Sequence, residues 1–320
     1  MTWWEAIILG IVEGITEYLP VSSTGHLLVV QDLMGIGMED PDAWKAANAF
    51  AICIQAGAIL AVLNLYWQRV KQGTVGMLGL VKIGKGDDAG KRLFINLVVA
   101  FTPAAVIGLI ADDWIEANLF NAWTIVAAWF VGGVAILGVA IWKRGKSGDE
   151  HVGKDIDSMT TSMAFTIGLI QCMAMMPGTS RSLVTIVGGV LVGMHIAAAV
   201  EFSFLLGVVT LLAATVYKAR EAGPLMLEEY GWSPMIIGSI AAWISAVVAI
   251  KWMVSYLKKH GMRVFGVYRI SIAVLVAALI LTGHISATTP DKQNSPEIKA
   301  PAAPSTSLAA PPDPAPLAHR

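Results

Sequence analysis

Long apolar stretches separated by short polar connections make up most of this chain. Six of them lie at about 46–66, 91–111, 122–142, 196–217, 232–257 and 263–283. Each is close to the ~20 residues that cross the hydrocarbon core of a bilayer as a helix. The pattern therefore predicts six membrane-spanning helices.

Two further apolar regions, 3–34 and 159–194, are interrupted in the middle by Pro20 and by Pro177-Gly178. A proline within an apolar helix ends or kinks it, because the ring removes a backbone donor and clashes with the preceding turn. Each region is therefore predicted to be a re-entrant helical hairpin, with two short helices on either side of a polar turn.

The composition agrees with a multi-pass membrane protein. Of the 320 residues, 56% are hydrophobic and 14% are charged, whereas soluble domains carry about 25% charged residues. The net charge of -1 provides no basic surface, so we exclude nucleic-acid binding. Cys53 and Cys172 lie far apart without a CxxC motif and are expected to pack. Glu5 and Glu13 interrupt the first apolar run, which argues against a cleaved signal peptide.

The distribution of Lys and Arg predicts the orientation. The connections 67–92, 143–158 and 258–269 carry six, four and four basic residues, whereas 112–121 carries none and 218–231 carries two among three glutamates. Basic connections stay on the cytoplasmic side. The first three connections are therefore expected in the cytoplasm and the last two outside.

This orientation makes the two hairpins enter the membrane from opposite sides. We expect an all-α membrane protein with two inverted-topology repeats, each a hairpin plus three transmembrane helices, and a site between them near the midplane. The boundaries are a single membrane domain 1–285, with repeat one at about 1–142, a cytoplasmic loop 143–158 and repeat two at about 159–285. Residues 286–320 contain eight of the fourteen prolines and are predicted to be a disordered tail.

The first polar turn reads Glu13-Gly-Ile-Thr-Glu17-Tyr-Leu-Pro20-Val-Ser22-Ser23-Thr24-Gly25-His26. Glu13 and Glu17 are four residues apart and share a helix face. In a low dielectric, such a pair favours a shared proton, a general base or a bound cation. A short interfacial helix whose acids reach water is the alternative.

The hydroxyls after Pro20 suit two compatible roles. Ser22, Ser23 and Thr24 are expected to cap the second hairpin helix, and a helix start also binds anions. His26 is either a hydrogen-bonded structural residue or an acid, base or orienting group facing Glu17.

The second polar turn, Met176-Pro177-Gly178-Thr179-Ser180-Arg181-Ser182, supplies a cation inside an apolar run. A buried Arg181 needs a partner. A substrate phosphate suits its forked donors, and pairing with Glu13 or Glu17 is the structural alternative.

These two turns resemble the motifs of a known family. The segment from Glu13 to His26 is similar to the glutamate-rich first motif of the undecaprenyl pyrophosphate phosphatase family, the BacA type associated with bacitracin resistance, and Pro177 to Ser182 is similar to its Pro-Gly-x-Ser-Arg-Ser motif. The segments 50–62 and 201–206 also resemble family segments. The chain departs from the usual pattern at Leu183, Val184, Val208 and Val209.

The resemblance implies a bacterial inner-membrane enzyme that removes the terminal phosphate of undecaprenyl diphosphate and regenerates the lipid carrier for cell-wall synthesis. It also implies an interdigitated inverted-repeat fold with a site open to the outer, periplasmic side. The expected partners are the polyprenyl diphosphate substrate and membrane lipids. A homodimer and a bound divalent cation, Mg or Ca, are left open.

As a hypothesis, Ser23 is the nucleophile, Glu17 and His26 activate or orient it, and Arg181 clamps the diphosphate. Glu13 holds a divalent cation, alone or with Glu17, or tunes Glu17. Direct attack by water with Ser23 only binding is the other mechanism. The expected substrate-binding residues are Glu13, Ser22, Thr24, Gly25, Gly178, Ser180, Ser182 and Thr185.

Two other functions share features with this sequence. A lipid or anion transporter or flippase shares the inverted-repeat plan with broken helices. The acid-phosphatase-like lipid phosphatases expect a histidine shortly after the arginine and an aspartate beyond it. Here the next histidine after Arg181 is His195, with no aspartate nearby, which disfavours that class.

Overall fold

The computed structural model describes residues 1–83, 87–146 and 153–287, and the chain is helical in these ranges apart from turns and one isolated bridge between Lys154 and Met194. The predicted tail from residue 288 onward lies outside them. The α-helices are α1 (Trp3–Thr16), α2 (Ser23–Met34), α3 (Pro41–Leu65), α4 (Trp67–Leu80), α5 (Asp88–Leu119), α6 (Ala122–Lys146), α7 (Thr161–Gln171), α8 (Arg181–Leu191), α9 (Ile196–Tyr230), α10 (Trp232–His260) and α11 (Arg263–Leu281). Two short 3-10 helices are η1 (Ile156–Ser158) and η2 (Cys172–Met175).

The six predicted spans are confirmed as helices long and apolar enough to cross a membrane: α3, α5, α6, α9, α10 and α11. Three predicted connections contain more helix than expected. Residues 67–80 form α4, α5 continues to Leu119, and α9 continues to Tyr230. In the stretches of α5 and α9, Glu, Lys, Arg and Ala favour helix, and the charged residues among them lower the hydropathy. A polar stretch thus marks the edge of the apolar span, and the helix continues past it.

Both broken regions form a helix, a turn and a second helix. α1 ends before Pro20 and α2 begins at Ser23, while α7 and η2 end before Pro177 and α8 begins at Arg181. Each second helix is capped by a serine in the same unusual backbone conformation, Ser22 at φ 76 and ψ 103 and Ser180 at φ 73 and ψ 114. A non-glycine residue with positive φ is strained. The two turns therefore share one demanding geometry.

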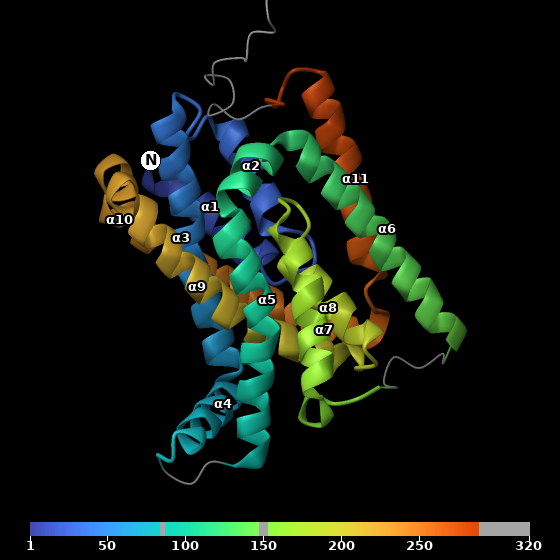
Figure 1. Ribbon diagram of the computed structural model, residues 1–320. Helices are drawn as coiled ribbons and strands as arrows, with labels where there is room; N and C mark the ends of the chain where they lie inside the picture. The colour runs from blue at the N-terminus through green and yellow to red at the C-terminus, as the bar shows by residue number, and fades with distance from the viewer. Residues whose placement is uncertain (84–86, 147–152, 288–320) are drawn as a thin grey trace, which may run out of the picture.

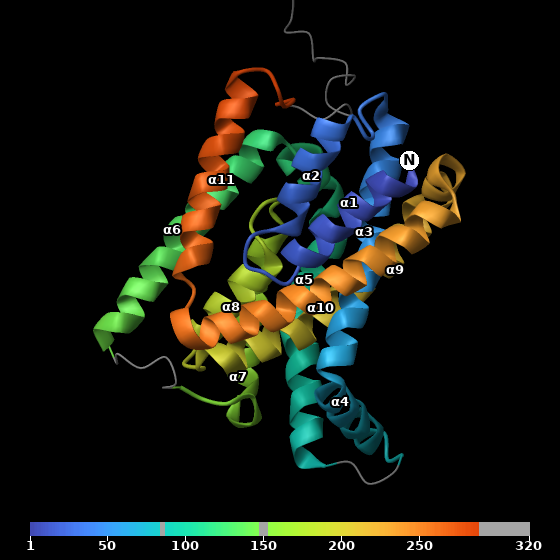
Figure 2. The same cartoon turned by 180° about the vertical axis from the view of Figure 1, so that it is seen from behind.

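The hairpin helices pack on spans from the other half of the chain. α1 lies along α10 and α7 along α5, while α3 packs on α9 and α6 on α11. Figures 1 and 2 show α6 and α11 side by side at one edge of the molecule, and α1 beside α10 when it is seen from behind. The α1–α10 contact is close, because a Cβ at Gly10 would lie 2.3 Å from the carbonyl oxygen of Gly238. Small residues permit such helix approaches in membranes.

One basic residue lies elsewhere than the sequence suggested. Arg269 was counted among the residues of a cytoplasmic connection, but α11 begins at Arg263. Arg269 is therefore inside this helix, and its exposed fraction is 0%. Periodicity alone did not separate a cation at the helix edge from one in its interior.

Candidate active site

The two polar turns meet at the carboxylate of Glu17. Oε2 of Glu17 accepts a hydrogen bond from Oγ of Ser23 at 2.5 Å, and Oε1 accepts one from Nη2 of Arg181 at 3.0 Å. All three side chains are buried. The Arg181 side chain is 8% exposed and that of Glu17 is 6% exposed, and Ser23 is also buried. One acid therefore joins a hydroxyl of the first turn to the guanidinium of the second.

The guanidinium of Arg181 is held from three sides and keeps a free donor. Nη1 donates to the carbonyl oxygen of Ser203 at 2.8 Å, and Cζ lies 5.4 Å from the centroid of the Tyr18 ring. α9 carries Gly207 here, and a Cβ at that position would lie 2.3 Å from Nη1. Nε is buried and has no hydrogen-bond partner among the described residues. The ion pair with Glu17, left as an alternative by the sequence, thus exists without using every donor.

The hydroxyls of Ser180, Ser182 and Thr185 bond within the protein. Ser180 Oγ accepts from the backbone N of Leu183 at 3.2 Å and lies 3.0 Å from Ser182 Oγ. Ser182 Oγ donates to the carbonyl oxygen of Leu19 at 2.9 Å, directly linking the two turns. Thr185 Oγ1 donates to the Arg181 carbonyl oxygen at 2.8 Å. In this structure these side chains hold the turns in shape.

The sequence left His26 as either a hydrogen-bonded structural residue or a group facing Glu17, and its hydrogen-bond partners in the structure are other groups than Glu17. Its Nδ1 lies 2.6 Å from the carbonyl oxygen of Ser22, and its Nε2 lies 2.8 Å from the hydroxyl of Tyr268 on α11. The ring stacks on Tyr268 at 5.8 Å and lies 5.0 Å from the Trp129 ring. Both ring nitrogens therefore have partners, one in the preceding turn of the chain and one on α11. Glu17 is the carboxylate that contacts Ser23.

Glu13 is the least satisfied polar group near the turns. Its exposed fraction is 0%, and neither carboxylate oxygen has a hydrogen-bond partner among the described residues. Glu17 and Arg181 are its charged neighbours. The hydroxyls of Tyr18 and Thr179 are also buried and unpaired. Because buried polar groups are normally bonded, these atoms are candidates for bonding to a water, a cation or a substrate group.

The other predicted residues lie in the turns themselves. Ser22 Oγ accepts from the backbone N of Gly25 at 3.4 Å, and Thr24 is half-buried in the first turn of α2. Gly178 has φ +86, and a Cβ there would lie 2.8 Å from Cα of Ile125. A Cβ at Gly25 would lie 2.5 Å from the Trp129 ring. These two glycines let α6 approach both turns.

Sequence reasoning missed the contribution of α6 and α11. Trp129 Nε1 donates to the carbonyl oxygen of Val21 at 2.8 Å, and Arg269 contacts carbonyl oxygens of both turns. An arginine six residues inside an apolar helix was the available signal. Glu201, in the segment 201–206 that resembles a family segment, belongs to another cluster, where its Oε1 accepts a hydrogen bond from Nε of Arg69 at 2.7 Å.

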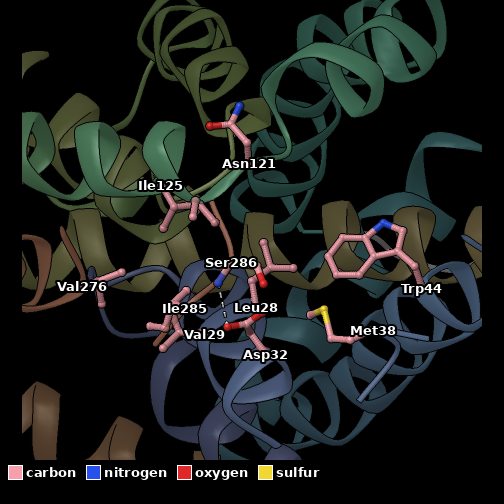
Figure 3. Close-up of a pocket in the computed structure, with 11 residues that line it drawn as sticks. Leu28, Val29, Asp32, Met38, Trp44, Asn121, Ile125, Val276, Ile285 and Ser286 are labelled. Atoms are coloured by element: carbon pink, nitrogen blue, oxygen red, sulfur yellow. Dashed lines mark hydrogen bonds between the residues drawn. The ribbon is translucent and has the colours of Figure 1, made fainter. Parts of the chain in front are cut away.

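A separate pocket lies along α2 beyond the turns (Figure 3). Asp32 supplies the only acid of its lining, and its Oδ2 accepts from the backbone N of Ser286 at 3.1 Å. Ile125 lines the pocket and also contacts the region of Gly178. The pocket lining is mostly apolar: Leu28, Val29, Asp32, Met38, Trp44, Asn121, Ala122, Ile125, Val276, Ile285 and Ser286.

The fold and the site define a multi-pass helical membrane protein in which two broken hairpins bring an acid, a hydroxyl and a guanidinium together. Comparison with known proteins is more specific. Residues 6–275 match the family model described as "Bacitracin resistance protein BacA", and the chain belongs to this family.

Several similar proteins carry the name "Undecaprenyl-diphosphatase". The protein from Porphyromonas gingivalis is 38% identical over 291 residues, which cover 88% of this chain and 98% of that protein. The protein from Ectopseudomonas mendocina is 40% identical over 280 residues, 86% of this chain and 93% of that protein. The protein from Sorangium cellulosum is 39% identical over 277 residues, 86% of each.

Proposed function

We propose that this chain is an integral-membrane phosphatase that hydrolyses undecaprenyl diphosphate to undecaprenyl phosphate and inorganic phosphate, recycling the cell-wall lipid carrier. The observation that carries the proposal is the single carboxylate of Glu17 bonded to both Ser23 and Arg181. Membership of the BacA family and the name shared by the relatives support the same substrate.

Phosphoanhydride hydrolysis needs a nucleophile and positive charge on the transferred phosphoryl group. Ser23 Oγ attacks the terminal phosphorus while Glu17 takes the serine proton. The bond from phosphorus to the bridging oxygen breaks, and undecaprenyl phosphate leaves. Water then hydrolyses the phosphoserine. Arg181 and the backbone N–H groups at the start of α2 stabilise the phosphoryl oxygens.

The geometry gives His26 a supporting part in this scheme. Its bond to the Ser22 carbonyl oxygen fixes the residue that caps α2, next to the nucleophile. In the rival mechanism Glu17 deprotonates a water that attacks phosphorus directly, and Ser23 only positions that water. A rapid burst of covalently phosphorylated enzyme, absent in Ser23→Ala, supports the serine route. A fully active Ser23→Ala supports the water route.

A divalent cation fits Glu13 better than Glu17. The two oxygens of Glu13 are buried and unpaired, whereas both oxygens of Glu17 accept hydrogen bonds. Carboxylate oxygens are the ligands that Mg²⁺ and Ca²⁺ prefer. Glu13, together with phosphate oxygens of the substrate, would hold the ion, which would neutralise phosphate charge.

The single membrane domain is proposed to consist of two inverted repeats. Three observations support this plan: the matching conformations of Ser22 and Ser180, the exchanged packing of α1 on α10 and α7 on α5, and a buried polar residue nine positions before each serine. These residues are Glu13 (22 − 13 = 9) and Gln171 (180 − 171 = 9), and both have an unpaired polar atom.

The membrane orientation follows from the same plan. The basic connections predict that the α4–α5 end faces the cytoplasm, and membership of the BacA family supports a site that opens to the outer side of the bacterial inner membrane. In Figure 1, the α4–α5 end lies at the bottom, and the ends of α2 and α5 lie at the top. This separation agrees with the assignment of these connections to opposite sides.

The test is phosphate release by purified protein in detergent from undecaprenyl diphosphate. Wild-type protein is expected to release phosphate, whereas a transporter or flippase releases none. Glu17→Ala and Arg181→Ala are assayed in parallel. Wild-type turnover in both variants would refute the site, and no release by folded wild-type protein would refute the function.

A further inference from the structure

Arg269 lies between the two polar turns, deep inside the protein. Its exposed fraction is 0%. Nη1 donates to the carbonyl oxygen of Pro20 in the first turn at 3.3 Å, and Nη2 donates to that of Gly178 in the second turn at 2.9 Å. We propose that Arg269 is a positioning residue that fixes the two turns relative to each other for the reaction.

The same guanidinium is anchored to α6. Nη2 also donates to the carbonyl oxygen of Ala128 at 2.8 Å, and Nε donates to that of Trp129 at 3.4 Å. Four carbonyl oxygens from three segments therefore converge on one side chain. The planar fork of an arginine presents several donors in fixed directions, which a lysine cannot do.

Electrostatics distinguishes Arg269 from the buried cation of the site. Arg181 is paired with Glu17, but every hydrogen-bond partner of Arg269 among the described residues is a neutral carbonyl group. Burying a cation without a carboxylate is costly. The Arg269 guanidinium lies where it bonds to both turns, which favours a role in aligning them over simple filling of the core.

The bonded carbonyl groups are close in sequence to the reacting groups. Pro20 lies between Glu17 and Ser23, and Gly178 lies three residues before Arg181. Tyr268, the residue before Arg269, holds His26. α11 thus secures the acid and nucleophile on one side and the phosphate-binding cation on the other. A misplacement of about 1 Å in such a constellation can cost about 100-fold in rate.

α6 offers a way to move the guanidinium without replacing it. A Cβ at Gly132 would lie 2.4 Å from Nη2 and 2.8 Å from Cζ of Arg269, so Gly132→Ala displaces the end of the side chain. Gly138 lies in the same helix, and a Cβ there meets no heavy atom within 4 Å. Gly138→Ala is therefore a matched control for the loss of a glycine in α6.

The inference rests on the proposed phosphatase function, so the experiment compares kcat and KM for undecaprenyl diphosphate in wild type, Arg269→Lys, Gly132→Ala and Gly138→Ala. Lysine keeps the charge but loses the four-carbonyl contact. We expect kcat to fall about 10- to 100-fold in Arg269→Lys and Gly132→Ala. KM should change by less than about threefold, because Arg181 and the lipid contacts remain, and Gly138→Ala should behave as wild type.

Hydrogen–deuterium exchange on the same detergent-solubilised proteins gives a readout that needs no activity. Faster exchange is expected in peptides of both turns for Arg269→Lys and Gly132→Ala, and in neither turn for Gly138→Ala. The proposal is overturned if both variants keep wild-type kcat per folded molecule, if KM rises with kcat unchanged, or if exchange in the turns does not change. An inactive wild type with altered exchange in the two variants would refute the phosphatase function and retain the alignment of the turns.

Discussion

The two hairpins share a backbone conformation at their turns and differ in the side chains that the turns carry. Each second helix begins after a serine with positive φ whose hydroxyl accepts a backbone N–H bond. The first residue of that helix is Ser23 in one hairpin and Arg181 in the other. The difference teaches that one backbone conformation can present different chemistry: the first turn places a carboxylate and a hydroxyl at the contact and the second turn places a guanidinium there, and the proposed mechanism assigns them separate tasks.

The largest expected effect comes from removing the cation of the second turn. Arg181→Ala leaves the Glu17 carboxylate buried without its ion pair and removes the charge proposed for the phosphoryl group. Arginines in phosphoryl transfer are worth about 10³- to 10⁵-fold in rate. We expect kcat/KM for undecaprenyl diphosphate to fall at least 10³-fold, measured by phosphate release.

Arg181→Lys tests whether charge alone is sufficient. Lysine cannot bond to the Ser203 carbonyl oxygen and Glu17 in the fork geometry of arginine, so its activity should remain well below wild type. Wild-type activity in Arg181→Lys would show that the forked contact is dispensable. The melting temperature of each variant in detergent separates lost chemistry from lost fold.

A second comparison sets one hydroxyl from each turn against the other. Ser23 donates to the Glu17 carboxylate, whereas Ser182 donates to the carbonyl oxygen of Leu19. On the serine route, Ser23→Ala should lower kcat by at least about 10²-fold, because the nucleophile is lost. Ser182→Ala should mainly reduce stability, by about 1 kcal/mol for one hydrogen bond.

Single-turnover phosphate release and thermal unfolding measure the two effects. Equal losses of kcat in Ser23→Ala and Ser182→Ala would mean that the turns do not divide their tasks as proposed. A larger loss in Ser182→Ala would reverse the assignment.

Much of this arrangement could be predicted from the sequence, for identifiable reasons. Apolar length marks the spans, and Pro20 and Pro177 mark the breaks. A lone Arg181 in an apolar run requires an anionic partner. These signals are local. The thickness of a bilayer sets the length of a span, and a proline ring breaks a helix, whatever the rest of the fold is.

The missed features depend on packing between distant segments. His26 bonds to Tyr268, which is 242 residues away, so no local pattern could choose between that hydroxyl and Glu17. The start of α11 at Arg263 agrees with the predicted span 263–283, but no local pattern could show that Arg269, which was counted in the connection 258–269, is fully buried and bonded to α6 and both turns. The polar ends of α5 and α9 were missed because they also depend on a contact between distant segments. Nζ of Lys218 on α9 lies 3.2 Å from Oδ2 of Asp112 and 3.1 Å from Oε2 of Glu116 on α5.

A third prediction concerns the matched polar residues that precede the turns. Glu13 carries a charge, whereas Gln171 at the corresponding position does not. Glu13→Gln makes the two hairpins alike while keeping the side-chain shape. We expect about a 10-fold loss of activity and a loss of any stimulation by Mg²⁺ or Ca²⁺, since an amide oxygen is a weaker ligand for a hard cation than a carboxylate.

The measurement is a cation titration of phosphate release for wild type and Glu13→Gln, with Gln171→Glu as the matched variant in the other hairpin. An unchanged cation dependence in Glu13→Gln would exclude Glu13 as the cation ligand. Its role would then be limited to tuning Glu17.

The smallest expected effects concern the backbone conformation that the two turns share at Ser22 and Ser180. At Ser22 and Ser180, glycine relieves the strain of positive φ, worth about 1 kcal/mol, while loss of the serine cap to glycine costs only a few tenths of a kcal/mol. Alanine keeps the strain and loses the cap, at a cost of about 1 kcal/mol. At both positions the glycine variant should therefore melt at or slightly above the wild-type temperature and the alanine variant a few degrees below it. If the order of stability differs between the two serines, the turns do not share one energetic basis, and their similar angles arise from different surrounding contacts.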